Sequence, residues 1–295
     1  MNEHISLTVL VENSVNTRGL LAEHGWAVWI QAGAQSLLFD TGQSQLLQAN
    51  AQTLGVSLQK AQSVVLSHGH FDHTGGLATI LSASPQAQVF VHPAALAAKY
   101  ARRNDGRTVS AGMIASAAQA LREREASVHW TTDVTEVAGG IFVTGKVPRL
   151  TLFEDTGGQF FLDEQCNEPD PLTDDQSLFF ETREGIVVVL GCAHSGVVNT
   201  LQHIRQITGG KPIHTVLGGM HLLNAKPERI EQTIQAFRQL GIQRVGPAHC
   251  TGMAATARLW SAFPNDCVGC SVGTRLEFIG IRGQDSDSQQ SQANH

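Results

Sequence analysis

Residues 66–76 read Leu-Ser-His-Gly-His-Phe-Asp-His-Thr-Gly-Gly, and this stretch decides how the rest of the chain is interpreted. It places four potential metal ligands, His68, His70, Asp72 and His73, within six residues. Alternate side chains of an extended segment share a face, so His68 and His70 should point the same way. A turn then lets Asp72 and His73 reach a second point nearby. The stretch therefore predicts a site for two cations at the end of a strand.

Imidazole and carboxylate ligands at this density are typical of zinc, and they also suit iron or manganese. Two such ions about 3.5–4 Å apart would share a water molecule and lower its pKa towards neutrality. A surface cluster of histidines without function is the alternative. A charged loop that ends an apolar strand has, however, no structural need for three histidines. We therefore expect two divalent metal ions as cofactors, Zn in the first place, with Fe or Mn as alternatives.

Composition excludes several classes of protein. The 295 residues are 42% hydrophobic and 16% charged, which provides enough apolar side chains for a substantial core. A net charge of -6 leaves no basic excess for general binding to nucleic acid or to an anionic membrane. We recognise no secretory signal and no run long enough to span a bilayer, and so expect a cytoplasmic protein. The expected partner is a small-molecule substrate, and the oligomeric state is left open.

Strand-like and helix-like runs alternate along the chain and indicate an α/β fold. Hairpins are expected over 26–39 and 177–190, and helices over 44–54, 198–207 and 227–240. The Ala-rich segment 94–127 is interpreted as a helical insertion, because it is too short to bury a core of its own. Residues 1–283 are taken as one domain. The Ser/Gln/Asp-rich residues 284–295 are expected to be a disordered tail.

The stretch 66–76 resembles the signature of the metallo-β-lactamase superfamily. Asp40, in the run Leu-Phe-Asp-Thr-Gly, matches the first motif of that superfamily, an aspartate that usually braces the metal loop. The resemblance thus implies that Asp40 supports the ligands from behind. It also implies an αββα sandwich of the metallo-β-lactamase type, made of two similar halves, with the metals at one edge and here with the helical insertion.

Further runs narrow the resemblance to one branch of the superfamily. Members of this branch are called metal-dependent hydrolases, or are described as similar to 7,8-dihydropterin-6-methyl-(ribofuranosyl)aminobenzene 5'-phosphate synthase. The match covers about residues 5–280 and implies a phosphorylated or pterin-like small molecule as substrate. The runs that carry it are residues 9–13, 174–178, 190–196, 218–222 and 246–252.

Four ligands cannot fill two coordination spheres, so distant segments must contribute. His194 and His249 each follow an apolar strand within a glycine-containing loop, and a buried structural histidine is the alternative for each. In the superfamily a histidine usually precedes the second hairpin and a bridging aspartate follows it. Here Asp175 precedes the hairpin and Cys192 follows it, so Asp175 either binds a metal or braces its loop. Cys192 and Cys250 are interpreted as buried packing residues.

The expected activity is that of a binuclear metal-dependent hydrolase, in which a metal-activated hydroxide attacks an ester, lactone or phosphoester. Asp72 would bind metal and orient the hydroxide. His221, which follows a predicted strand, is a candidate general acid, with a substrate contact, a ligand or a structural role as alternatives. Lys146 and Arg149, together with Lys99, are candidate contacts for an anionic substrate; a solvated basic surface is the alternative.

Three other functions stay open at this point. A condensing synthase would use the metals to join a pterin diphosphate to an arylamine. A redox enzyme would hold two iron ions, but we recognise no flavin-binding segment beside the cluster. A non-catalytic binding module would keep the fold for ligand sensing, and the intact ligand cluster counts against it. His24 has no neighbouring pattern and is interpreted as a structural or surface residue.

Overall fold

Strands of the N-terminal part of the chain, together with the last strand, form the first β-layer. The computed structural model describes residues 2–103 and 105–281. The apolar runs on either side of Gly33 pair as an antiparallel hairpin, as the sequence predicts. Parallel strands extend the layer on one side of this hairpin. In spatial order the strands are β8 (Val128–Trp130), β5 (Gln88–Val91), β4 (Ser63–Val65), β3 (Gln35–Phe39), β2 (Ala27–Ala32), β1 (Asn2–Val11) and β16 (Arg275–Ile281).

The second β-layer repeats this plan with later parts of the chain. A hairpin that turns before Gly185 leads into parallel strands. The layers meet where Thr182 pairs with Gly280, so hydrogen bonding continues from one layer to the other. In spatial order the strands are β9 (Thr135–Ala138), β10 (Ile141–Val143), β12 (Leu178–Thr182), β13 (Gly185–Leu190), β14 (Ile213–Gly219) and β15 (Arg244–Ala248).

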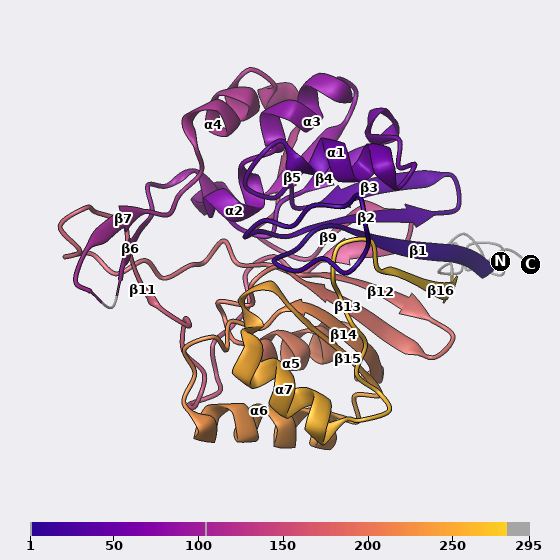
Figure 1. The fold of residues 1–295 in the computed structure, drawn as a ribbon, viewed down its shortest axis with the longest axis vertical. Coiled ribbons are helices and arrows are strands. Elements are labelled where there is room, and N and C mark those ends of the chain that lie inside the picture. The colour runs from indigo at the N-terminus through magenta and orange to yellow at the C-terminus, as the bar shows by residue number, and fades with distance from the viewer. Residues whose placement is uncertain (1, 104, 282–295) are drawn as a thin grey trace, which may run out of the picture.

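Helices cover the outer face of each layer (Figure 1). On the first layer they are α1 (Leu46–Thr53), α3 (Leu77–Ala83) and α4 (Ala115–Arg122), and on the second α5 (Val197–Ile207), α6 (Pro227–Leu240) and α7 (Met253–Ala262). Apolar side chains fill the space between the two layers and the space under each set of helices. The expected αββα sandwich is therefore confirmed.

Helix α6 shows why the local sequence predicts these elements well. Pro227 occupies its first turn, where a missing N–H costs nothing, and Gly241 ends it in a left-handed conformation with φ 72°. Ile230, Ile234 and Phe237 recur at helical spacing and are buried against the second layer. The residues at both ends of α6 and the spacing of its apolar residues indicate the same helix, which spans residues 227–240 as the sequence predicts.

The expected helical insertion over 94–127 is wrong for its central part. Residues there form strands β6 (Tyr100–Arg102) and β7 (Thr108–Ser110), between the 3-10 turn η2 (Pro93–Leu96) and helix α4. Strand β6 pairs with β11 (Gln159–Phe161), and this small sheet projects beyond the sandwich (Figure 1). Pairing with a segment almost 60 residues away overrides the local helix preference.

Two expectations concern the tail and membranes. Residues 284–295, expected to be a disordered tail, lie outside the described residues. Across the described ranges, every helix is too short or too polar to cross a lipid bilayer.

The loops that follow several strands gather at one edge of the sandwich. Parallel strands place their carboxyl ends together, and this is where α/β proteins commonly bind ligands. Here β3 runs parallel to β4, and β13, β14 and β15 run parallel to one another. The residues that follow these strands include Asp40, His68, His70, Asp72, His73, Cys192, His194, His221 and His249.

Candidate metal centre

The loop after β4 and the short helix α2 (Phe71–Thr74) carry the first group of candidate ligands. His68 Nε2 lies 2.9 Å from His70 Nδ1, and both side chains are buried. Asp72 and His73 lie on the short helix α2 and face a second point, with His73 Nε2 3.7 Å from Asp72 Oδ2. The rings of His68 and His73 are 4.3 Å apart between centroids. The two positions at which these side chains converge therefore lie next to each other.

Asp40 lies behind this loop and fixes it. Its Oδ1 accepts a hydrogen bond from the Ser67 amide at 2.7 Å, and its Oδ2 accepts one from the Ser67 hydroxyl at 2.7 Å. Oδ2 also lies 2.6 Å from His73 Nδ1, which leaves His73 Nε2 to face the cluster. The role of Asp40 as a support for the ligands stays a prediction, and it rests on these contacts.

His194, which follows β13, faces the rings of His68 and His70. Its ring centroid is 4.8 Å from each of theirs. Its Nδ1 donates a hydrogen bond to the Thr156 carbonyl at 2.9 Å, so Nε2 turns into the cluster. Within the described part of the chain, Nε2 of His194 and Nε2 of His70 are buried without a hydrogen-bond partner. An unsatisfied buried polar atom costs about 1–3 kcal/mol, which a bound cation would offset.

His249, in the 3-10 turn η4 (His249–Thr251), joins Asp72 and His73. Its Nε2 is 3.2 Å from His73 Nε2 and 3.2 Å from Asp72 Oδ2. Its Nδ1 lies 3.0 Å from Asn13 Oδ1, and its backbone amide donates to Glu12 Oε1 at 2.8 Å. Two nitrogen atoms and one carboxylate oxygen thus converge on the second point.

Burial keeps most of these rings neutral. It lowers the pKa of His70 to about 3 and lowers the pKa values of His68 and His194 well below the ordinary value. Burial also opposes the charge on His73, but nearby carboxylates, Asp40 foremost, outweigh it and raise the pKa of His73 to about 9. Neutral imidazole is the form that binds a metal, because its lone pair is free.

Asp175 lies beside the His194 loop and outside the converging groups of ligand atoms. Its Oδ2 accepts a hydrogen bond from the Ser195 amide at 2.8 Å. Burial raises the pKa of Asp175 to about 6. Its Oδ1 is buried and finds no hydrogen-bond partner among the residues described. Bracing of the loop by Oδ2 is visible, and metal binding through Oδ1 stays a prediction.

The basic residues expected to contact an anionic substrate are placed differently. Lys99 is buried, with Nζ 2.8 Å from Asp170 Oδ2 and 2.9 Å from Asp174 Oδ1. It therefore neutralises carboxylates below the metal loop and is not part of a solvated surface. Lys146 and Arg149 are exposed, and no contact described for either side chain reaches the histidines. Their role in substrate binding stays a prediction.

His221 and the segment around β11 lie over one side of the cluster. The rings of His221 and His194 are 4.2 Å apart between centroids. Phe160 covers His70 and His194 at centroid distances of 4.9 and 5.0 Å. Gly157 passes so close that a Cβ there would lie 1.8 Å from His221 Cδ2. This segment shields the rings from solvent, and the catalytic role of His221 stays a prediction.

Two residues that were not predicted to bind metal lie within the cluster. Cys192 Sγ is 3.1 Å from His73 Nε2, and His24 Nε2 is 3.1 Å from Asp72 Oδ2. Cys192 stands at the end of an apolar strand in the same Gly-Cys-Ala-His run as His194, a signal that could have identified it. His24 precedes β2 and has no comparable signal, because only the fold brings it to Asp72.

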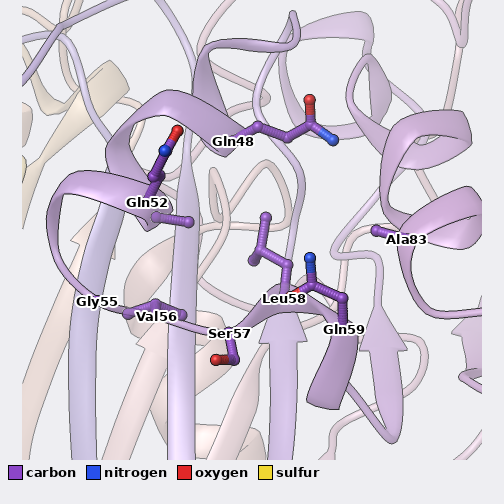
Figure 2. Close-up of a pocket in the computed structure, with 9 residues that line it drawn as sticks. Gln48, Gln52, Gly55, Val56, Ser57, Leu58, Gln59 and Ala83 are labelled. Atoms are coloured by element: carbon purple, nitrogen blue, oxygen red, sulfur yellow. The ribbon is translucent and has the colours of Figure 1, made fainter.

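A hollow of about 510 Å³ lies elsewhere, between α1 and the turn that follows it (Figure 2). Its lining consists of uncharged side chains, among them Gln48, Gln52 and Leu58. It offers hydrogen bonds but no titratable group.

Comparison with known proteins identifies several relatives. A family model described as Metallo-beta-lactamase superfamily matches residues 21–249. A 7,8-dihydropterin-6-methyl-4-(beta-D-ribofuranosyl)-aminobenzene-5'-phosphate synthase from Methanocaldococcus jannaschii is 27% identical over 276 residues, which cover 87% of this chain and 90% of that protein. The uncharacterized protein MJ0448 from the same organism is 27% identical over 254 residues, 86% of this chain and 93% of that protein.

Solved structures show the same architecture. A crystal structure of Tm1679, described as a metal-dependent hydrolase of the beta-lactamase superfamily, matches with a TM-score of 0.79 and 30% identity, covering 95% of this chain and 100% of that one. A diphosphatase from the PhnP family matches with a TM-score of 0.51 and 14% identity, covering 95% of this chain and 100% of that one. The second likeness shows the fold alone.

Proposed function

The chain belongs to the metallo-beta-lactamase superfamily, and on that premise we propose that it is a metal-dependent hydrolase of a small molecule with an ester, lactone or phosphoester bond. One observation carries the proposal. Ligand atoms of His68 and His194 form one buried group, and those of His73 and His249 form another beside it. A chain with no need for metal would have little reason to bury unpaired imidazoles at the edge where its strands end.

The donor set fits two divalent cations. His68, His70 and His194 would hold one cation, and Asp72, His73 and His249 the other. Asp175 would add an oxygen ligand through Oδ1. Histidine nitrogens with a carboxylate are typical of zinc, and iron and manganese accept the same set. Such cations polarise the substrate oxygen and make water nucleophilic near neutral pH.

The chain's own residues orient the ligands and protect the site. Asp40 and the Thr156 carbonyl fix which nitrogen of His73 and of His194 faces the cluster. Phe160 excludes water from the side of His194. His221, next to His194, would deliver a proton to the leaving group, since imidazole exchanges protons near neutral pH.

The proposed substrate class is based on the name of one relative and on two exposed basic residues of this chain. The synthase of Methanocaldococcus jannaschii is named for a phosphorylated pterin compound and covers most of this chain. Lys146 and Arg149 are exposed and able to meet a phosphate group. We therefore propose a phosphorylated or pterin-like substrate.

A second candidate function is a condensing synthase. The name of the same relative favours it, since that protein is a synthase at 27% identity. In this case an arylamine would take the place of water as the nucleophile, and the same ligands would serve. A di-iron redox role and a non-catalytic binding role have no comparable observation in their favour.

Metal analysis combined with a substrate screen tests the proposal. Freshly purified protein should contain zinc, iron or manganese, and removal of the metal by a chelator should abolish hydrolysis. Supporting residues around metals contribute about 10–100-fold, so His70→Ala, which removes a ligand, should lower activity at least about 100-fold. His129→Ala, at an exposed histidine bonded to Gln88, is the matched control.

The screen should include phosphodiesters, phosphate monoesters and lactones, and also a pterin diphosphate with an arylamine. Hydrolysis of a member of the first set supports the hydrolase. Condensation without hydrolysis would establish the synthase instead. A chain that holds and takes up none of the three metals would contradict both.

A further inference from the structure

Within the described residues, three of the four groups of converging ligand atoms share one member, the thiol of Cys192, and the fourth consists of His24, Asp72 and His249. Its Sγ lies within 4.8 Å of the ligand atoms of His68 and His194. It also lies within 4.8 Å of the ligand atoms of His73 and His249. We propose that Cys192 is a metal ligand whose sulfur bridges the two cations, an inference that rests on the proposed function.

The geometry suits a bridge. Cys192 Sγ is 3.1 Å from His73 Nε2, and the residue is 2% exposed. A zinc–sulfur bond is about 2.3 Å long, so one sulfur can reach two ions up to about 4.6 Å apart. Paired catalytic ions lie about 3.5–4 Å apart, which is within that reach. On binding, the S–H bond gives way to bonds from sulfur to the cations, and the proton leaves to solvent.

Apolar packing does not account for this cysteine. Cys267 and Cys270 are members of the hydrophobic core clusters and fit the role of small apolar residues. Cys192 is buried too, but among the described residues it belongs to none of these clusters. Its surroundings are imidazole nitrogens and another thiol. Burial in a polar, ligand-rich place is characteristic of a metal ligand.

The backbone on both sides of Cys192 places its sulfur close to the histidine cluster. Gly191 lets the strand end approach the metal loop, because a Cβ there would lie 2.2 Å from Ser67 Oγ. Ala193, on the other side of Cys192, has φ 52°, a left-handed conformation that non-glycine residues rarely adopt. Such strain costs about 1–3 kcal/mol and concentrates at functional sites. The close approach and the strained residue together aim Sγ at the cluster.

Cys250 serves as the partner of this sulfur. Its thiol donates a hydrogen bond to Cys192 Sγ at 3.3 Å and lies 3.7 Å from the Cys192 carbonyl oxygen. A donor on the sulfur orients its lone pairs, as supporting contacts do for other ligands. Cys250 Sγ converges with Cys192 and His221, but among the described residues it belongs neither to the group with His68 and His194 nor to the group with His73 and His249. Cys250 is therefore assigned to positioning Cys192 and not to the bridge.

X-ray absorption at the zinc edge of the full-length, zinc-loaded protein tests the inference directly. We expect two zinc ions per chain and a sulfur neighbour at about 2.3 Å for each ion. Loaded zinc with nitrogen and oxygen neighbours alone would overturn the bridge and leave the hydrolase proposal standing. Failure to take up zinc, iron or manganese would overturn both, so the two failures are distinguishable.

Cobalt-substituted variants identify which cysteine is involved. The unaltered protein and the control Cys166→Ser, at a thiol beside Thr108, should show the near-ultraviolet charge-transfer absorption of a cobalt-bound thiolate. Cys192→Ser should lose this band, and Cys250→Ser should keep it. Loss in Cys250→Ser with retention in Cys192→Ser would make Cys250 the ligand and refute the inference. If Cys192→Ser does not fold, zinc-edge absorption of Cys250→Ser decides, since its sulfur neighbour must persist.

Discussion

At the scale of single residues, the contacts behind the rings decide how the cluster can bind metal. In three of the rings the outer nitrogen has an oxygen beside it: Asp40 at His73, the Thr156 carbonyl at His194 and Asn13 at His249. These contacts orient the rings and select the nitrogen that faces inward. The proposed ligands are thereby held in place by residues that do not themselves face the cluster.

Asp40→Asn should weaken metal binding while the fold persists. The amide has the same shape but lacks the charge, so it holds the His73 ring less firmly and makes Nε2 a poorer donor. We expect metal affinity to fall by about 10–100-fold, measured by competition with a coloured chelator. Asp266→Asn, at an exposed aspartate, is the control. Equal affinities in the two variants would contradict a supporting role for Asp40.

His24→Ala should weaken one cation more than the other. His24 Nε2 contacts Asp72 Oδ2, whereas no contact described for His24 involves His68 or His194. Because the His24 side chain is half exposed, we expect a loss near the lower end of the range for supporting residues, about tenfold. A calorimetric titration should then separate two binding phases. A single phase with unchanged affinity would show that His24 has no part in the centre.

At the scale of elements, helix α5 begins without a cap of its own. Gly196 precedes it and has no side chain, so the first amides of the helix need an outside acceptor. Glu154 supplies it, with Oε1 accepting from the Val198 amide at 2.9 Å and Oε2 from the Asn199 amide at 2.8 Å. This carboxylate ties the segment that covers the cluster to the helix beneath it.

Glu154→Ala should therefore destabilise the protein. Loss of an N-terminal capping side chain costs about 0.5–2 kcal/mol, and a similar decrease in the free energy of unfolding is expected. Chemical denaturation measures it, with Glu184→Ala at an exposed glutamate as the control. Because the covering segment also loosens, the KM of the variant should rise. Unchanged stability would mean that water replaces Glu154 at the helix end.

Elements also show what a single sequence can and cannot reveal. The boundaries of α6 and the hairpin at Gly33 were predictable, because caps, turns and apolar periodicity act locally. Strand β6 was not, since it lies between β7 and the distant β11, and the pairing with β11 depends on the folded chain. His24 was missed for the same reason, as it meets Asp72 only in the folded chain. The candidate ligands between His68 and His73 could be recognised from the sequence, because they lie within six residues of one another.

At the scale of the whole molecule, the proposed metal centre connects the two layers. His68, His70, Asp72 and His73 follow a strand of the first layer, whereas His194 and His249 follow strands of the second. Among the described residues, strands of the two layers pair at Thr182 and Gly280, where β12 meets β16, and loop contacts such as the bond from the His249 amide to Glu12 add to this link. Cations held by both sets of ligands would therefore link the layers at the edge that carries the site.

Removal of metal should consequently lower the stability of the whole fold. A ligand that binds only the folded state stabilises it by about 4 kcal/mol when its concentration is a thousand times its Kd. Chelation should therefore lower the melting temperature measured by calorimetry, and zinc should restore it. Hydrogen exchange should increase in the loops after β4, β13 and β15 together, because the cations join them. In His70→Ala the shift on chelation should shrink, whereas in His129→Ala it should persist. Metal-free protein that melts at the unaltered temperature would show that the two layers hold together without the centre.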